Sequence, residues 1–117
     1  MKRQVFSDIY KRLNETFPLI QVLIGPRQVG KTTLALQVEK EFSQPVIYAS
    51  ADGPALKGHT WIEQQWNRAQ LRSTPERPSL LILDEIQKVS NWTETIKELW
   101  DDQQRSRRRV KLLLLGS

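Results

Sequence analysis

A glycine-bounded segment between an apolar run and a helix-forming stretch limits the fold of this chain more than any other feature. It extends from Gly25 to Thr32 with the sequence GPRQVGKT, which fits the pattern G-x-x-x-x-G-K-S/T, and it directly follows the largely apolar residues 19–24. Gly25 and Gly30 let the backbone curl, so that successive N–H groups form a nest for a polyphosphate at the positive end of the next helix. We therefore expect a strand over residues 19–24, a phosphate-binding loop and a helix over residues 31–42.

Side chains within this loop are suited to nucleotide chemistry. Lys31 can reach the terminal phosphates, and the hydroxyl of Thr32 can ligate a magnesium ion. Arg27 either adds positive potential to the loop or points to solvent, and both alternatives remain open.

The overall composition is that of one soluble globular domain, since 38% of the 117 residues are hydrophobic and 26% are charged. Cysteine is absent, which excludes disulfide bonds and thiolate metal sites and agrees with a cytoplasmic location. The net charge of +5 suits a polyanionic partner but is also common in proteins without one. No apolar run approaches the roughly 20 residues that cross a bilayer, so we expect no membrane partner.

Hydrophobic periodicity divides the chain into an amphipathic helix over residues 1–18 and an α/β domain over residues 19–117. Strands alternate with helices along the second part, which favours a doubly wound parallel sheet with right-handed crossovers. After residue 42, the expected strands cover residues 46–50, 80–83 and 110–115. The expected helices cover residues 61–72 and the stretch after Asn91, where Asn91 and Glu94 resemble a capping box.

An acidic pair, Asp84-Glu85, closes the fully apolar strand 80–83. In a parallel sheet the ligand lies at the carboxyl ends of the strands, where this pair and Ser117 are both expected. We interpret Asp84 as the residue that holds magnesium through its water shell and Glu85 as the base that activates the attacking water. The alternative for the pair is a helix-capping acidic turn. Ser117, or the backbone of Gly116, could bond the γ-phosphate or the attacking water, although a Gly-Ser pair is also typical of a turn.

Three stretches together resemble the prokaryotic AAA-type P-loop ATPases that are usually fused to a C-terminal domain of unknown function. They are GPRQVGKTTL at residues 25–34, LILDEIQKV at residues 81–89 followed by Trp92, and LLGS at residues 114–117. The resemblance implies ATP and Mg²⁺ as ligands, metal contacts for Thr32 and Asp84, and catalytic roles for Lys31, Glu85 and the sensor Ser117. It implies nucleotide contacts for Gly25, Pro26, Arg27, Gln28, Val29, Gly30, Lys31, Thr32 and Thr33.

Such proteins continue past the sensor strand into a fifth strand and a helical lid, whereas this sequence stops at Ser117. We therefore expect a partial P-loop NTPase domain, truncated after strand four, with the strand order 2-3-4-1. ATP hydrolysis is expected of the full-length parent. The alternative is a nucleotide-binding regulatory module without efficient hydrolysis. A homo-oligomer or a C-terminal partner domain is the expected assembly.

The remaining polar and aromatic features have structural explanations that compete with functional ones. The basic cluster from Arg105 to Lys111 is expected at the amino ends of the strands as a solvated connection, and the alternative is a patch for nucleic-acid phosphates. Trp66, Trp92 and Trp100 are expected in the core rather than stacked on bases. His59 is interpreted as a loop residue and Asp52 as a turn residue, neither of them a metal ligand. 

Overall fold

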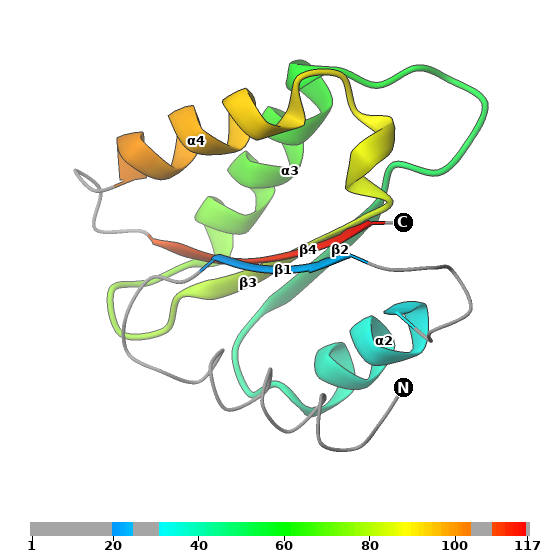
Figure 1. Cartoon of the computed structure of the whole chain (residues 1–117). Helices are drawn as coiled ribbons and strands as arrows, with labels where there is room; N and C mark the ends of the chain where they lie inside the picture. The colour runs from blue at the N-terminus through cyan, green and yellow to red at the C-terminus, as the bar shows by residue number, and fades with distance from the viewer. Residues whose placement is uncertain (1–19, 25–30, 104–108, 117) are drawn as a thin grey trace.

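A parallel β-sheet with helices on both faces forms the frame of the molecule (Figure 1). The computed structural model describes residues 20–24, 31–103 and 109–116, and the expected helix over residues 1–18 lies outside them. In the described part, the strands are β1 (Ile20–Ile24), β2 (Val46–Ser50), β3 (Ser79–Asp84) and β4 (Val110–Gly116). Their order across the sheet is β1-β4-β3-β2, which reads β2-β3-β4-β1 from the other edge, and each neighbouring pair is parallel. The expected parallel α/β sheet is confirmed.

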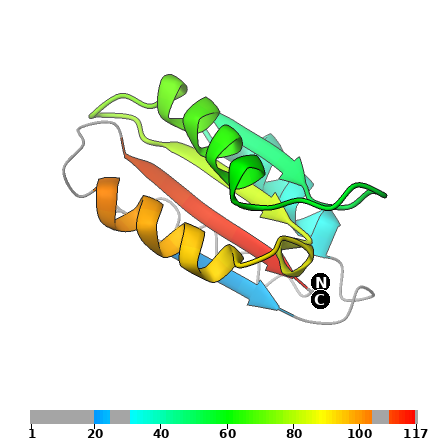
Figure 2. The same cartoon turned by 90° about the horizontal axis from the view of Figure 1, so that it is seen from above.

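The helices cover the sheet unequally. α2 (Lys31–Glu41) lies on one face, while α3 (His59–Arg72) and α4 (Trp92–Gln103) lie side by side on the other (Figures 1 and 2). A short 3₁₀ helix, η2 (Ile86–Lys88), connects β3 to the turn before α4. Every residue of β3 and β4 is buried, as expected for central strands of a sheet covered on both faces.

Alternation along the strands divides the buried side chains between the two faces. One core cluster joins α3 and α4 to one face of the sheet; its strand members are Ile47, Leu81, Leu83, Val110, Leu112 and Leu114. The residues between them in sequence, such as Tyr48, Ile82 and Leu113, therefore point to the α2 face. Val38 of α2 and Phe42 after it are buried, and their four-residue spacing places them on the same side of the helix.

The buried residues of α3 and α4 recur at helical spacing. Ile62, Trp66 and Ala69 of α3 and Ile96 of α4 are buried in the core cluster. The partly buried side chains packed against this cluster from the helices are Trp61, Trp92, Leu99 and Trp100. Trp66 therefore belongs to the core as expected, and Trp92 and Trp100 pack against it while partly exposed.

Three local expectations were wrong. Lys111 is only 2% exposed, because it lies inside the central strand β4, and so it is not part of a solvated basic run. His59 begins α3 instead of lying in a loop, and its Nε2 lies 3.9 Å from Oε1 of Glu63, one helical turn away. Asn91 has a left-handed φ of 55°, whereas the first residue of a capping box is extended. Arg105, Arg107 and Arg108 lie outside the described residues.

Candidate functional site

The carboxyl ends of the strands meet at one edge of the sheet, which is the candidate site. Ile24 at the end of β1 pairs in register with Gly116 of β4, and Leu83 of β3 pairs with Leu114. Asp84 pairs with Ser50 at the end of β2. Asp84 therefore lies at the edge from which β1 continues into the glycine-bounded loop, as predicted.

The other predicted site residues are described only in part. Residues 25–30 and Ser117 lie outside the described residues. Lys31 and Thr32 form the first turn of α2, directly after the loop, and their side chains are not described. Thr33 follows them in α2 and is exposed. The roles assigned to these residues stay predictions.

Asp84 is held from three sides. Its side chain is buried, with the residue 4% exposed. The hydroxyl of Tyr48 donates a 2.6 Å hydrogen bond to Oδ2, and the backbone N–H of Glu85 donates a 2.9 Å bond to Oδ1. The backbone carbonyl of Asp84 accepts a 2.9 Å bond from the N–H of Ala51. These bonds define the orientation of a carboxylate that is shielded from bulk water.

Tyr48 was missed by the sequence analysis, although its position follows from the register. It lies in β2 two residues before Ser50, the partner of Asp84, and it points to the same face as Asp84. Burial raises the pKa of the Tyr48 phenol, and the hydrogen bond to Asp84 and the negative charges of Asp84, Glu39 and Glu85 raise it further. The phenol is therefore protonated at neutral pH and acts as the donor. A polar ring two residues before the end of a strand was the signal that could have pointed to it.

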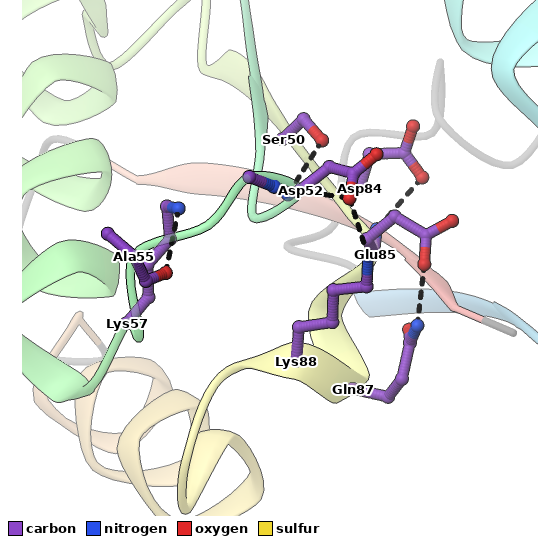
Figure 3. A network of polar contacts seen from close by, with 9 residues as sticks. Ser50, Asp52, Ala55, Lys57, Asp84, Glu85, Gln87 and Lys88 are labelled. Carbon is purple, nitrogen blue, oxygen red and sulfur yellow. Dashed lines mark hydrogen bonds and ion pairs between the residues drawn. The ribbon is translucent and has the colours of Figure 1, made fainter.

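Glu85 occupies a sharp turn between β3 and η2. Its φ of 55° and ψ of 42° lie in the left-handed region, which residues other than glycine rarely adopt. The residue is 9% exposed, and its Oε2 accepts a 2.5 Å hydrogen bond from Nε2 of Gln87 (Figure 3). This turn keeps the second carboxylate adjacent to Asp84 at the sheet edge.

The segment after β2 is tied to the segment after β3. Nζ of Lys88 lies 2.5 Å from Oδ1 of Asp52, which also accepts a 3.1 Å bond from the N–H of Gly53 (Figure 3). Further along, Lys57 and Val89 form a parallel bridge, and the N–H of Ser90 donates to the carbonyl of Lys57 at 3.2 Å. Asp52 is thus the turn residue that was expected, and it also anchors η2.

The donor chemistry of the edge suits magnesium rather than a softer metal. Carboxylate and hydroxyl oxygens are the ligands that Mg²⁺ prefers. Within the described residues, each carboxylate oxygen of Asp84 accepts one hydrogen bond, which leaves one lone pair on each oxygen. No cluster of three or more His, Cys, Asp or Glu side chains is found in the described residues, so an all-protein metal cage is not formed there. None of the helices within the described ranges is both long and apolar enough to cross a membrane.

A groove of about 440 Å³ lies between α3 and α4, on the opposite face of the sheet from Asp84. Four carboxylates line it, from Glu63, Glu94, Glu98 and Asp102. Their negative charge disfavours a polyphosphate, so the groove is not the candidate nucleotide site.

Comparison with known proteins agrees with the fold described above. Two variants of RuvB from Thermotoga maritima share the fold, with TM-scores of 0.62 and 0.57 at 20% and 21% identity. The matches cover 97% of this chain but only 37% and 35% of the RuvB chains. No curated protein matches the sequence.

A family model described as an AAA domain matches residues 18–117, which is most of the chain. The resemblance to prokaryotic AAA-type P-loop ATPases is thereby confirmed. On this evidence the chain belongs to the AAA domain family.

Proposed function

We propose that this chain binds ATP together with Mg²⁺ and that its full-length parent hydrolyses ATP to ADP and phosphate. One observation carries the proposal: Asp84 is buried and doubly hydrogen-bonded at the sheet edge where β1 runs into the G-x-x-x-x-G-K-T loop. A fixed carboxylate at the sheet edge where such a loop begins suits phosphoryl transfer, because that reaction depends on positioning and charge stabilisation.

The ligands are assigned to residues as follows. Residues 25–33 bind the nucleotide, with the N–H groups of the loop and Lys31 on the phosphates. Thr32 and Asp84 hold the magnesium ion, and Asp84 acts through the ion's water shell. When bound, the ion neutralises charge that develops on the phosphate oxygens.

Glu85 is the proposed base. Its carboxylate is adjacent to Asp84 and is held by Gln87, so it is suitably placed to orient a water molecule and take its proton. Ser117 is proposed as a polar contact to the γ-phosphate, on the resemblance alone. A cytoplasmic location and assembly as a homo-oligomer, or with a C-terminal partner domain, are also parts of the proposal.

Two variants test binding and hydrolysis separately, by titration with a fluorescent ATP analogue and by phosphate release. Lys31→Ala is expected to weaken binding by at least about tenfold, because a charge-assisted contact to phosphate is lost. Glu85→Gln is expected to keep the affinity and to lose hydrolysis. Glu98→Gln, an exposed position on α4, is the matched control and should change neither quantity.

The outcomes distinguish the proposed roles. Unchanged binding by Lys31→Ala would contradict the phosphate site, and normal turnover by Glu85→Gln would remove Glu85 from its role. Binding without phosphate release by the unaltered chain would favour the alternative, a regulatory module in which the bound nucleotide is read by a partner.

A further inference from the structure

We propose that Tyr48 is a positioning residue for the magnesium-binding carboxylate, and that its hydroxyl holds Asp84 in the orientation that receives the water shell of the ion. This inference rests on the proposed function and adds a residue that the phosphate-loop and acidic-pair motifs do not contain. Tyr48 belongs to β2, 36 residues before Asp84 in sequence.

The first argument is the count of hydrogen-bond acceptors. A carboxylate has about four lone-pair positions, two on each oxygen. Tyr48 occupies one position on Oδ2 at 2.6 Å, and the Glu85 N–H occupies one on Oδ1 at 2.9 Å. As far as the described residues go, one position remains on each oxygen, so the carboxylate can accept a hydrogen bond from a metal-bound water molecule at each of them.

The second argument is the charge of the donor. The hydroxyl of a tyrosine donates a hydrogen bond without adding positive charge, so Asp84 keeps its negative charge for the metal. A lysine in the same place would neutralise the carboxylate and compete with Mg²⁺.

The third argument is rigidity. Tyr48 and Asp84 belong to adjacent strands paired in register, so the phenol oxygen is held by the backbone of the sheet. Of the two bonds to the carboxylate, the one from Glu85 comes from the neighbouring residue. The bond from Tyr48 is the one that ties the side chain to another strand, and without it rotation about χ1 and χ2 of Asp84 is less restricted.

Tyr48→Phe tests the inference, because it removes the hydroxyl and keeps the ring. Affinity for the fluorescent ATP analogue is measured with excess Mg²⁺ and with EDTA. We expect the Mg²⁺ concentration for half-maximal enhancement of binding to rise about tenfold, since a hydrogen bond to a charged group is lost. The affinity for the analogue in EDTA should stay unchanged. A defect in the folded structure would lower this affinity as well.

Asp84→Asn supplies the second half of a double-mutant cycle. In that background the carboxylate is already lost, so adding Tyr48→Phe should cause no further change in Mg²⁺ dependence. Additive losses in the cycle would overturn the positioning role, and so would an unchanged Mg²⁺ dependence in Tyr48→Phe alone. If the unaltered chain binds the analogue equally with Mg²⁺ and EDTA, or does not bind it, the proposed function itself fails.

If Tyr48→Phe does not fold, fluorine NMR of the chain with Tyr48 in place tests the inference instead. The chain contains two tyrosines, so incorporation of 3-fluorotyrosine yields two fluorine NMR signals, and Tyr10→Phe assigns them. Adding Mg²⁺ to the analogue-bound chain should shift the Tyr48 signal, because the metal draws electron density from Asp84. In Asp84→Asn, Mg²⁺ should no longer shift the Tyr48 signal. A Tyr48 signal that does not change when Mg²⁺ is added to the unaltered chain would refute the inference.

Discussion

Glu85 and Asn91 share a φ of 55°, and each lies where the chain turns sharply after an element. Glu85 leaves β3 and Asn91 precedes α4, so η2 is enclosed between two left-handed residues. For a residue with a Cβ, this conformation costs about 1–2 kcal/mol, less for asparagine, which hydrogen-bonds locally. At Glu85 the strain coincides with the proposed base, in line with the concentration of backbone strain at functional sites.

Substitution of Asn91 should reveal this strain. Asn91→Gly is expected to leave stability unchanged or slightly raised, whereas Asn91→Val should lower the free energy of unfolding by about 1–2 kcal/mol. Urea denaturation followed by tryptophan fluorescence measures both. Ser90→Val, at the adjacent exposed position, is the control and should stay within about 0.5 kcal/mol of the unaltered chain. Equal losses for the glycine and valine variants of Asn91 would contradict the role of φ.

At the scale of elements, two helix–strand junctions are closed by buried polar side chains. Gln103 at the end of α4 is 1% exposed. Its Oε1 accepts a 2.9 Å hydrogen bond from the Val110 N–H, and its Nε2 donates a 3.3 Å hydrogen bond to the Val110 carbonyl. At the end of α3, the hydroxyl of Ser73 donates to the Ala69 carbonyl at 3.0 Å and accepts from the Ser79 N–H at 2.9 Å. Both junctions lie at the amino edge, so the opposite edge is left to the candidate site.

Gln103→Leu is expected to destabilise the fold by about 1–3 kcal/mol, because the Val110 N–H and carbonyl lose side-chain partners in a buried place. Chemical denaturation measures the change. Gln64→Leu, at an exposed position of α3, is the matched control and should be close to neutral. A Gln103 variant as stable as this control would show that the junction does not depend on the amide.

At the scale of the whole molecule, stability depends on the layer between the sheet and the α3–α4 pair. Leu81 lies in the centre of that layer, fully buried in the core cluster. β3 and β4 contribute most of the strand residues of this cluster, so loss of packing there affects all the elements around it. Cavities in such a layer cost both transfer free energy and lost contacts.

Leu81→Ala is therefore expected to lower the free energy of unfolding by about 2–5 kcal/mol. Leu71→Ala makes the same chemical change on α3 at a side chain that is 75% exposed, and it should change stability by less than about 0.5 kcal/mol. Equilibrium denaturation of the two variants checks the contrast. Similar losses of stability in the two variants would contradict the central role of the layer between the sheet and the α3–α4 pair.

Much of the frame was predictable because its signals are local. The strand over residues 46–50 matches β2 at both ends, and the apolar run 80–83 lies within β3. The stripe of Ile62, Trp66 and Ala69 faces the core, as the period of a helix requires. Asp84 at the end of an apolar strand is also a local pattern, so its place at the sheet edge was predicted correctly.

Sequence alone therefore determined the features that depend on residues close together in the chain. These are the hydrophobic period of each helix and strand, the sequence pattern of the glycine-bounded loop and the acidic pair at a strand end. Tertiary structure decided what depends on strands far apart in sequence. Tyr48 reaches Asp84 only through the β2–β3 register, and Lys111 is buried only because β4 is central. The physical reason is that a side chain's hydrogen-bond partners and burial are set by the residues across the sheet, and the periodicity of one strand does not specify those residues.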